Sequence, residues 1–232
     1  MTNPIPYADL PGNADKYSFD FIPVLDNSPL AGKHICALGS SVTHGATALG
    51  YAVGEYIAAR FGCSLTKEAV SGTTLSTAVA NNYVERMLGN VDPNAHFDLL
   101  IVQLSTNDVK RCPNLGEIAP GTDLDSFDTN TITGAMEYII CYGRKTWNCP
   151  VVFYTSSYFE SDFYPLMLER LKQLQTKYGI GILNLYENKV FNTISEAEHS
   201  LYMKDAFHPT KAGYRDWWGP ELEKQLLAYL QA

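Results

Sequence analysis

Residues 33–43 have the sequence Lys33-His34-Ile35-Cys36-Ala37-Leu38-Gly39-Ser40-Ser41-Val42-Thr43, a short apolar run that ends in glycine and hydroxyl residues. An apolar run of this length that stops at a glycine predicts a buried strand ending at one edge of a sheet. The next segment, Ala46 to Arg60, has the apolar spacing of a helix, so Ser41 is expected in a tight turn near a helix N-terminus. Backbone N–H groups and the positive end of the helix dipole favour an anion there, either a bound phosphate or the oxyanion of an acyl transfer.

The rest of the chain alternates short apolar runs with segments of helical periodicity. The runs predict further strands at Ser64–Val70, Asp98–Leu104, Val151–Ser156 and Gly181–Leu185. The periodic segments predict helices near Leu75–Leu88, Thr131–Trp147, Tyr164–Tyr178 and Ala212–Leu230. Because parallel strands need crossover connections, which the helices supply, we expect an α/β protein: a three-layer α/β/α sandwich with a flavodoxin-like, five-stranded parallel sheet.

The first residues differ in character from the rest. Residues 1–32 are rich in Pro, Asn, Asp and aromatic side chains and show no clear period, so we expect an arm packed on the body and docked by Phe19, Phe21, Ile22 and Val24. Residues 33–232 show no further boundary and are expected to form a single domain.

Composition excludes several classes of partner. The chain has 17 basic and 25 acidic residues, a net charge of −8, and no basic run, so nucleic acid and anionic membrane surfaces are not expected as partners. The N-terminus lacks a basic region followed by an apolar core, and no apolar stretch approaches membrane-spanning length, which favours a cytoplasmic location. His34, His96 and His199 show no metal-ligand spacing, so neither a metal nor another cofactor is predicted, and a homo-oligomer remains an option.

Two connections are longer than a simple crossover. Residues 108–130 follow the third predicted strand, and residues 156–165, which contain several aromatic side chains, follow the fourth. Both should emerge beside Ser41 at the carboxyl edge of the sheet, so we expect them to form the walls of a binding site. The candidate substrate contacts are Tyr158, Phe159, His44 and Asp108.

Four short motifs fall at predicted strand ends or just before the last helix. They are Gly39-Ser40-Ser41-Val42-Thr43, Ser71-Gly72-Thr73, Ser105-Thr106-Asn107-Asp108 and Asp205-Ala206-Phe207-His208-Pro209. Each motif alone is weak, but their order along an α/β chain resembles the SGNH, or GDSL-type, family of serine hydrolases. The resemblance covers most of the chain and implies that residues 33–232 form one SGNH-type hydrolase domain.

The resemblance implies a role for each matching residue. Ser41 is similar to the family's nucleophile, and Asp205 and His208 to the pair that completes its catalytic triad. The backbone N–H groups of Ser41 and Gly72 and the side-chain amide of Asn107 correspond to its oxyanion hole. The chain departs from the family pattern at Ser40, where aspartate is usual, and at Ser105, where glycine is usual, and these departures bear on substrate preference more than on catalysis.

The residue types agree with acyl transfer on physical grounds. A serine hydroxyl needs a neighbouring base to become a nucleophile at neutral pH, and His208 can supply one. Asp205, three residues earlier, can fix the histidine tautomer from the same side of a turn. Each motif also has a purely structural interpretation: Ser41 and Asp205 as caps, Gly72 and Asn107 as turn residues. Their joint occurrence favours the hydrolase.

The leading hypothesis is a serine esterase that hydrolyses short-chain acyl esters through an acyl-enzyme on Ser41. The substrate would be a small ester, and aromatic residues such as Tyr158 favour O-acetylated carbohydrate. A lysophospholipase or thioesterase of the same family is an alternative. From another class, a flavodoxin-like carrier could hold the FMN phosphate at residues 39–45, or the domain could be a catalytically silent binding module.

Overall fold

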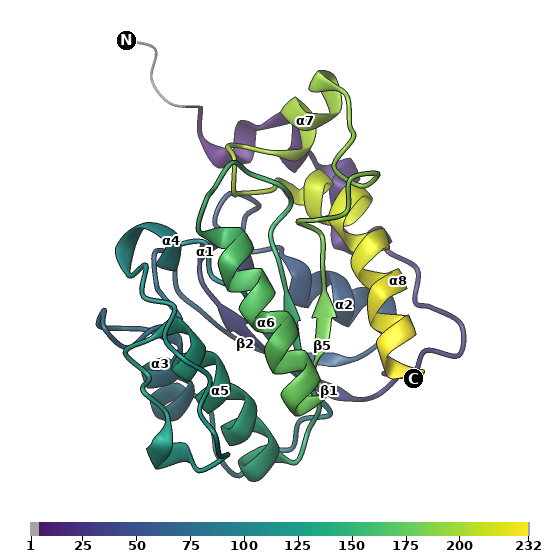
Figure 1. The fold of residues 1–232 in the computed structure, drawn as a ribbon. Coiled ribbons are helices and arrows are strands. Elements are labelled where there is room, and N and C mark those ends of the chain that lie inside the picture. The colour runs from purple at the N-terminus through teal and green to yellow at the C-terminus, as the bar shows by residue number, and fades with distance from the viewer. Residues whose placement is uncertain (1–4, 232) are drawn as a thin grey trace.

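The computed structural model describes residues 5–231 and is organised around a five-stranded parallel sheet (Figure 1). Its strands are β1 His34–Gly39, β2 Ser64–Ala69, β3 Leu99–Gln103, β4 Val151–Tyr154 and β5 Gly181–Leu183. All neighbours pair in parallel in the order β2-β1-β3-β4-β5, which confirms the predicted flavodoxin-like sheet. The order reverses beside β1, so the carboxyl ends of β1 and β3 flank the place where such sheets bind ligands.

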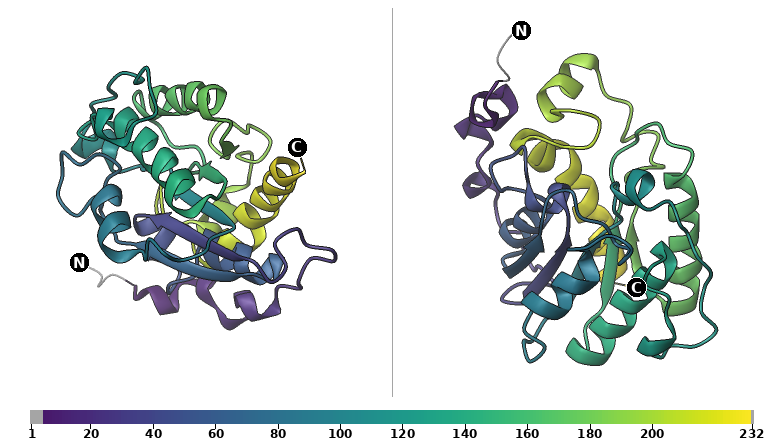
Figure 2. Two further views of the ribbon diagram at one scale, coloured as in Figure 1. Left: turned by 90° about the horizontal axis from the view of Figure 1, so that it is seen from below. Right: turned by 90° about the vertical axis from the view of Figure 1, so that its left-hand side faces the viewer.

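The sheet is covered on both faces, and alternate residues of each central strand serve different cores. On β3, Leu100 and Val102 face a core built with the helices α3 (Tyr83–Asn90), α5 (Ile132–Tyr142) and α6 (Tyr164–Tyr178). Leu99 and Ile101 face a second core built with α2 (Val53–Phe61) and α8 (Gly219–Leu230). Figures 1 and 2 show these two layers of helices on opposite sides of the strands. Burial on both faces explains why the strands are continuous apolar runs in the sequence.

The α-helices follow the strands in alternation. They are α1 Ser41–His44, α2 Val53–Phe61, α3 Tyr83–Asn90, α4 Asp108–Arg111, α5 Ile132–Tyr142, α6 Tyr164–Tyr178, α7 Glu196–Tyr202 and α8 Gly219–Leu230. One short π-helical segment, Gly143–Trp147, directly follows α5, and another, Gly213–Trp218, directly precedes α8. Within residues 5–231, no helix combines the length and the apolar character needed to span a bilayer.

Several predicted helices have different bounds in the structure. The segment 46–60 is helical only from Val53, because Gly45 (φ 75°) and Gly50 (φ 88°) place left-handed turns before it. The segment 75–88 is helical only from Tyr83, because the side chain of Asn82 accepts the backbone N–H of Glu85 and caps the helix there. Helix α7 was not predicted, since it buries none of its residues and has no apolar stripe.

The described part of the arm, residues 5–32, consists mainly of short 3₁₀ turns, and residues 1–4 lie outside the described residues. Phe19 is buried against the Tyr51 and Tyr56 rings, as expected for a docking residue. Ile22 is partly buried against the same core, as expected, whereas Phe21 and Val24 are 70% and 58% exposed and bury little surface in docking the arm. The arm lies beside α7 in Figure 2.

The long connection after β3 is held down over most of its length. Beyond α4 it crosses α5 and α6, where Lys177 Nζ donates to the Gly121 carbonyl at 2.9 Å and the Glu137 carboxylate accepts the Ala119 N–H at 3.0 Å. Only residues at its beginning, on α4, reach the cavity described below. The expectation that the whole of residues 108–130 walls the site is therefore wrong.

Candidate active site

Ser41 begins α1 directly after the end of β1, and its side chain is buried. The turn before it is fixed by Gln103, the last residue of β3. Gln103 Oε1 accepts the backbone N–H of Ser40 at 2.9 Å and that of Thr43 at 3.3 Å, together with both of their hydroxyls. Because β1 and β3 are adjacent strands, this one carboxamide holds the Ser41 turn against the rigid sheet.

The same contacts argue against a phosphate site at residues 39–45. A phosphate cradle needs backbone N–H groups and hydroxyls that point toward the ligand. Here the N–H groups and hydroxyls of Ser40 and Thr43 point to Gln103. The alternative of an FMN carrier therefore loses the donors of Ser40 and Thr43.

His208 and Asp205 lie on the loop between α7 and the last helical segment, and both are brought to Ser41. His208 Nε2 is 2.8 Å from Ser41 Oγ, and His208 Nδ1 is 2.8 Å and 2.9 Å from the Asp205 oxygens. An ionised carboxylate can only accept, so Nδ1 donates to Asp205, and in the neutral ring Nε2 is left to accept the Ser41 proton. The three side chains are thus arranged for proton transfer from Ser41 to His208.

The pKa of Asp205 keeps this carboxyl ionised. Partial burial acts to raise the pKa, but hydrogen bonds from the His208 ring and from the Phe207 N–H outweigh it and hold the pKa below its ordinary value. Asp205 Oδ1 also accepts the backbone N–H of His208 at 3.1 Å. The carboxylate therefore orients both the ring and the backbone of His208.

The loops after β1, β2 and β3 each carry a predicted oxyanion donor, of which Ser41 and Asn107 line one cavity and Gly72 is not among its lining residues. Gly72 adopts φ 79°, which an L-residue rarely tolerates, and its N–H has no acceptor among residues 5–231. The Ser41 N–H is at the first position of α1, where no intrahelical acceptor exists. Asn107 Nδ2 donates one hydrogen to the Thr73 carbonyl at 2.9 Å, which leaves its second hydrogen free. All three sites can therefore supply donors to an anion.

Arg86, on α3, ties these loops together from behind. Its side chain is only 3% exposed and pairs with Glu68 of β2 at 2.6 Å. Its Nη2 donates to the Gly39 carbonyl at 2.8 Å and to Thr73 Oγ1 at 3.0 Å. One guanidinium thus connects the strand end before Ser41 with the residue after Gly72.

Sequence reasoning missed both Arg86 and Gln103. Arg86 carried a usable signal, because it lies one helical turn from Tyr83, at the edge of the apolar face that Tyr83, Val84 and Met87 form, where a charged residue needs a buried partner. Gln103 carried none, since a polar residue at a strand end is ordinary. Its role follows only from the pairing of β1 with β3.

A cavity of about 390 Å³ opens above Ser41 and His208. Its walls come from α4 and from the loops after β3 and β4. The other lining residues are Thr106, Asn107, Val109, Lys110, Arg111, Phe159, Glu160 and Phe207. The reactive groups therefore share one small cavity with aromatic walls and a charged rim.

Of the four predicted substrate contacts, Phe159 and Tyr158 line a cavity at the site, whereas His44 and Asp108 do not. Phe159 lines the cavity, and Tyr158 is 61% exposed and lines an adjoining one. His44 is exposed at the C-terminal end of α1 and is not among the residues that line the cavity above Ser41, so the cavity gives no support to its predicted contact with substrate.

Asp108 is also misassigned as a substrate contact. Its buried carboxylate accepts the backbone N–H groups of Leu75 at 2.8 Å and Ser76 at 3.1 Å and so supports the loop that follows Gly72. Burial raises the pKa of Asp108 to about 6, against the lowering effect of hydrogen bonds from Ser105 and these amides. Its place is behind the site, where it connects the loops of Asn107 and Gly72.

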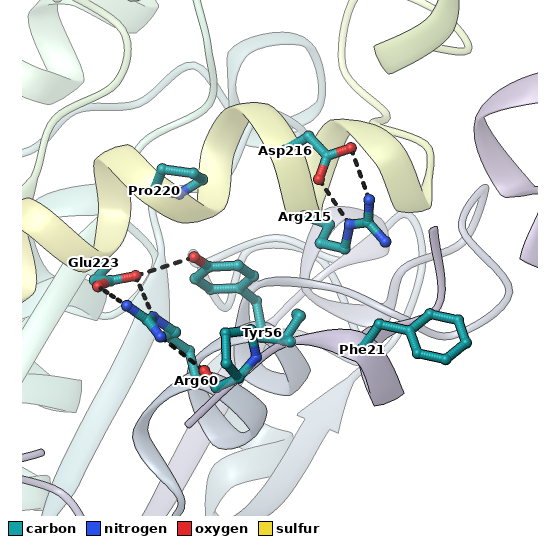
Figure 3. Close-up of a pocket in the computed structure, with 9 residues that line it drawn as sticks. Phe21, Tyr56, Arg60, Arg215, Asp216, Pro220 and Glu223 are labelled. Atoms are coloured by element: carbon teal, nitrogen blue, oxygen red, sulfur yellow. Dashed lines mark hydrogen bonds and ion pairs between the residues drawn. The ribbon is translucent and has the colours of Figure 1, made fainter. Parts of the chain in front are cut away.

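A larger cavity, of about 650 Å³, lies between the arm and helices α2 and α8 (Figure 3). Its charged residues are already paired: Arg60 with Glu223 at 2.8 Å and Arg215 with Asp216 at 2.7 Å. None of the predicted site residues lines it. Size alone therefore does not identify the reactive site.

Comparison with known proteins agrees with this geometry. The model of the GDSL-like Lipase/Acylhydrolase family matches residues 37–215. No curated protein matches the chain in sequence. A solved structure from Lactobacillus plantarum is 21% identical, with a TM-score of 0.69 over 85% of this chain and 98% of that chain.

Two other solved structures of the same fold carry functional names. An acetyl xylan esterase is 14% identical, with a TM-score of 0.60 over 82% of this chain and 98% of that chain. A family two carbohydrate esterase from Clostridium thermocellum, in complex with cellohexaose, is 13% identical, with a TM-score of 0.59 over 88% of this chain and 67% of that chain. At these identities the likeness shows a shared fold.

Proposed function

The chain belongs to the GDSL-like Lipase/Acylhydrolase family and is a hydrolase of ester bonds, and we propose that it is a serine esterase that forms an acyl-enzyme on Ser41. The observation that carries this proposal is the 2.8 Å distance between Ser41 Oγ and His208 Nε2, in a histidine whose other nitrogen is held by Asp205. A serine hydroxyl so placed has the base it needs to become a nucleophile.

In the proposed reaction His208 Nε2 takes the Ser41 proton while Ser41 Oγ bonds to the ester carbonyl carbon. The carbonyl oxygen becomes an oxyanion and accepts hydrogen bonds from the N–H groups of Ser41 and Gly72 and from Asn107 Nδ2. The C–O bond to the alcohol then breaks, and His208 returns its proton to the departing oxygen. A water molecule, deprotonated by His208, attacks the acyl-enzyme and releases the acid and free Ser41.

The cavity favours a short acyl group. Beyond Phe159 and Phe207 it is bounded by the charged side chains of Lys110, Arg111 and Glu160. A long alkyl chain would have to desolvate these charges, which is costly, whereas an acetyl group need not reach them. The names of the acetyl xylan esterase and the carbohydrate esterase of the same fold support O-acetylated carbohydrate as the substrate class. A lysophospholipase or thioesterase activity is the alternative within the family.

The test is hydrolysis of p-nitrophenyl acetate, butyrate and octanoate by the wild-type protein and by Ser41→Ala. We expect the mutant to lose nearly all turnover while its circular dichroism stays that of the wild type, and we expect rates to fall as the acyl chain lengthens. Ser126→Ala, an exposed serine hydrogen-bonded to the Asp123 carbonyl, serves as the matched control with unchanged turnover.

Two results would contradict the proposal. Turnover retained by Ser41→Ala would mean that another residue is the nucleophile. Preference for the octanoate ester would favour the lipid alternative, and a wild-type protein inactive on every ester tested would favour the silent binding module.

A further inference from the structure

A second cavity of about 400 Å³ adjoins the one above Ser41, and Phe159 and Glu160 line both. It is formed by the loop after β4, the segment before α7 and the loop that carries the catalytic-site histidine. The other lining residues are Ser157, Tyr158, Asn192, Ile194, His199, Met203, Asp205, Ala206 and Trp217. The proposed reaction uses the first cavity and leaves this one without a role.

Tyr158 presents an exposed aromatic ring in a fixed position beside this cavity. Although the residue is 61% exposed, its backbone N–H donates to Asn192 Oδ1 at 2.9 Å, and its ring packs on that of Tyr186 with centroids 5.4 Å apart. Asn192 is itself fixed, because its Nδ2 donates to the Leu185 carbonyl at 2.7 Å and the Asn188 carbonyl at 2.8 Å. A large aromatic surface that is held rigid and left open to solvent is typical of a binding surface.

Trp217, a second aromatic residue that lines this cavity, is held rigidly as well. The Trp217 indole N–H donates to the Phe191 carbonyl at 3.0 Å, and its ring stacks on Phe191 with centroids 4.7 Å apart. Polar groups stand around these aromatic walls, namely the carboxylate of Glu160 and the ring of His199. Aromatic surface for C–H faces, with carboxylate and imidazole groups for hydroxyls, is the combination that suits a sugar ring.

The position of the cavity assigns it to the alcohol portion of the ester. His208 protonates the departing alcohol in the proposed reaction, and Asp205, on the far side of the His208 ring from Ser41, lines the second cavity. Asn107, one of the proposed oxyanion donors, lines the first cavity with Ser41 and is not among the residues that line the second. A substrate held at Ser41 therefore has its alcohol toward Phe159, Glu160 and the second cavity.

We propose that this second cavity is a sugar-binding subsite, and that the alcohol of the substrate is an oligosaccharide whose neighbouring sugar stacks on Tyr158. This inference rests on the proposed esterase function, which it extends from the acyl group to the alcohol. The acylated sugar lies where the two cavities meet, at Phe159 and Glu160. The next sugar of the chain lies in the second cavity, against Tyr158.

The experiment compares Tyr158→Ala with wild type on p-nitrophenyl acetate, on an acetylated methyl xyloside and on acetylated xylo-oligosaccharides. Loss of one aromatic stacking surface is expected to lower kcat/KM about 10-fold for the oligosaccharides, mainly through KM. The two substrates without a second sugar should be hydrolysed as before. Phe21→Ala, which truncates a 70% exposed aromatic residue on the arm, is the matched control and should change none of the three rates.

Two outcomes would overturn the subsite: equal loss on all three substrates, or an unchanged kcat/KM on the oligosaccharides. A direct binding measurement separates this proposal from the esterase proposal. Unacetylated xylo-oligosaccharide should quench the tryptophan fluorescence of Ser41→Ala, and Tyr158→Ala should abolish that quenching. If no ester is hydrolysed but this binding is seen, the esterase proposal fails and the subsite stands; if esters are hydrolysed and no binding is seen, the reverse holds.

Discussion

Replacing Arg86 by methionine should weaken both the fold and the reaction, because this guanidinium joins the loops around Ser41. The variant Arg86→Met keeps an unbranched side chain but removes the partner of Glu68, whose side chain is only 17% exposed. Removing one member of a buried ion pair typically costs about 3–5 kcal/mol of unfolding free energy. The Gly39 carbonyl and the Thr73 hydroxyl lose a charged donor at the same time, so we expect a loss near the upper end of that range.

The effect on the reaction follows from Thr73. Its hydroxyl is held by Arg86, its carbonyl accepts from Asn107, and it is covalently joined to Gly72. A displacement of this loop by about 1 Å moves two of the proposed oxyanion donors, and misplacement of that size can lower a rate about 100-fold. We therefore expect kcat on p-nitrophenyl acetate to fall by that order while KM changes little.

The assays are urea unfolding followed by circular dichroism, and initial rates at a temperature where the variant is fully folded. Arg60→Met is the control, because Arg60 also forms a fork with a carboxylate, Glu223, and donates to the Pro23 carbonyl, but lies between α2 and α8 (Figure 3). It should lose stability and keep its kcat. A second variant, Glu68→Gln combined with Arg86→Met, should regain part of the stability and none of the activity. An Arg86→Met protein with normal kcat would refute the reasoning and leave Arg86 a purely structural residue.

Other predictions concern the groups around Ser41. Asn107→Ala removes one of the three proposed oxyanion donors and should lower kcat on p-nitrophenyl acetate about 10²–10³-fold with little change in KM; a decrease of only a few-fold would remove Asn107 from that role. Asp205→Asn should lower kcat about 10³–10⁴-fold, because the amide no longer selects the tautomer of His208 that accepts from Ser41, and a rate close to wild type would show that Asp205 does not orient the ring. The folded-state pKa of Asp108, about 6, lies above its ordinary value of 3.8, so the folded protein binds this proton more tightly than the unfolded chain. Its contribution to the unfolding free energy is therefore lost as the pH rises from about 4 to about 6, by up to about 3 kcal/mol; urea unfolding of wild type and Asp108→Asn across this range should show that difference, and parallel curves would contradict it.

The sheet could be predicted because it depends on patterns that are continuous in the sequence, whereas the meeting of Ser41 with His208 was implied by the resemblance of four short motifs to the SGNH family. A buried parallel strand is an unbroken apolar run, and each such run here ends in the residues that its carboxyl end presents. Helix α6 was predicted with its observed bounds, since Pro165 stands at its start and Gly179, with φ 62°, ends it. The capping box of Ser195 and Glu198 is a local signal for the start of α7. The spacing of apolar residues could not reveal this helix, because it has no apolar stripe.

The groups that hold the site together could not be predicted in the same way. Gln103 and Arg86 act through contacts between segments that are distant in the sequence, such as Gln103 with Ser40 and Arg86 with Thr73. Such contacts depend on strand register and on which face of α3 meets the sheet. Asp108 shows the opposite error, because proximity in sequence to Asn107 suggested a substrate contact that the direction of its side chain excludes.

The two departures from the family pattern were expected to bear on substrate preference, and their positions argue otherwise. Ser40 is fully buried, and its N–H and hydroxyl both donate to Gln103. Ser105 is also fully buried, and its hydroxyl accepts the backbone N–H of Asn107 at 3.2 Å. Both serines therefore support the turns that carry Ser41 and Asn107, and neither lines the cavity above Ser41. We therefore expect substrate preference to be set by the side chains that line this cavity, among which Phe159 and Glu160 also line the adjoining one.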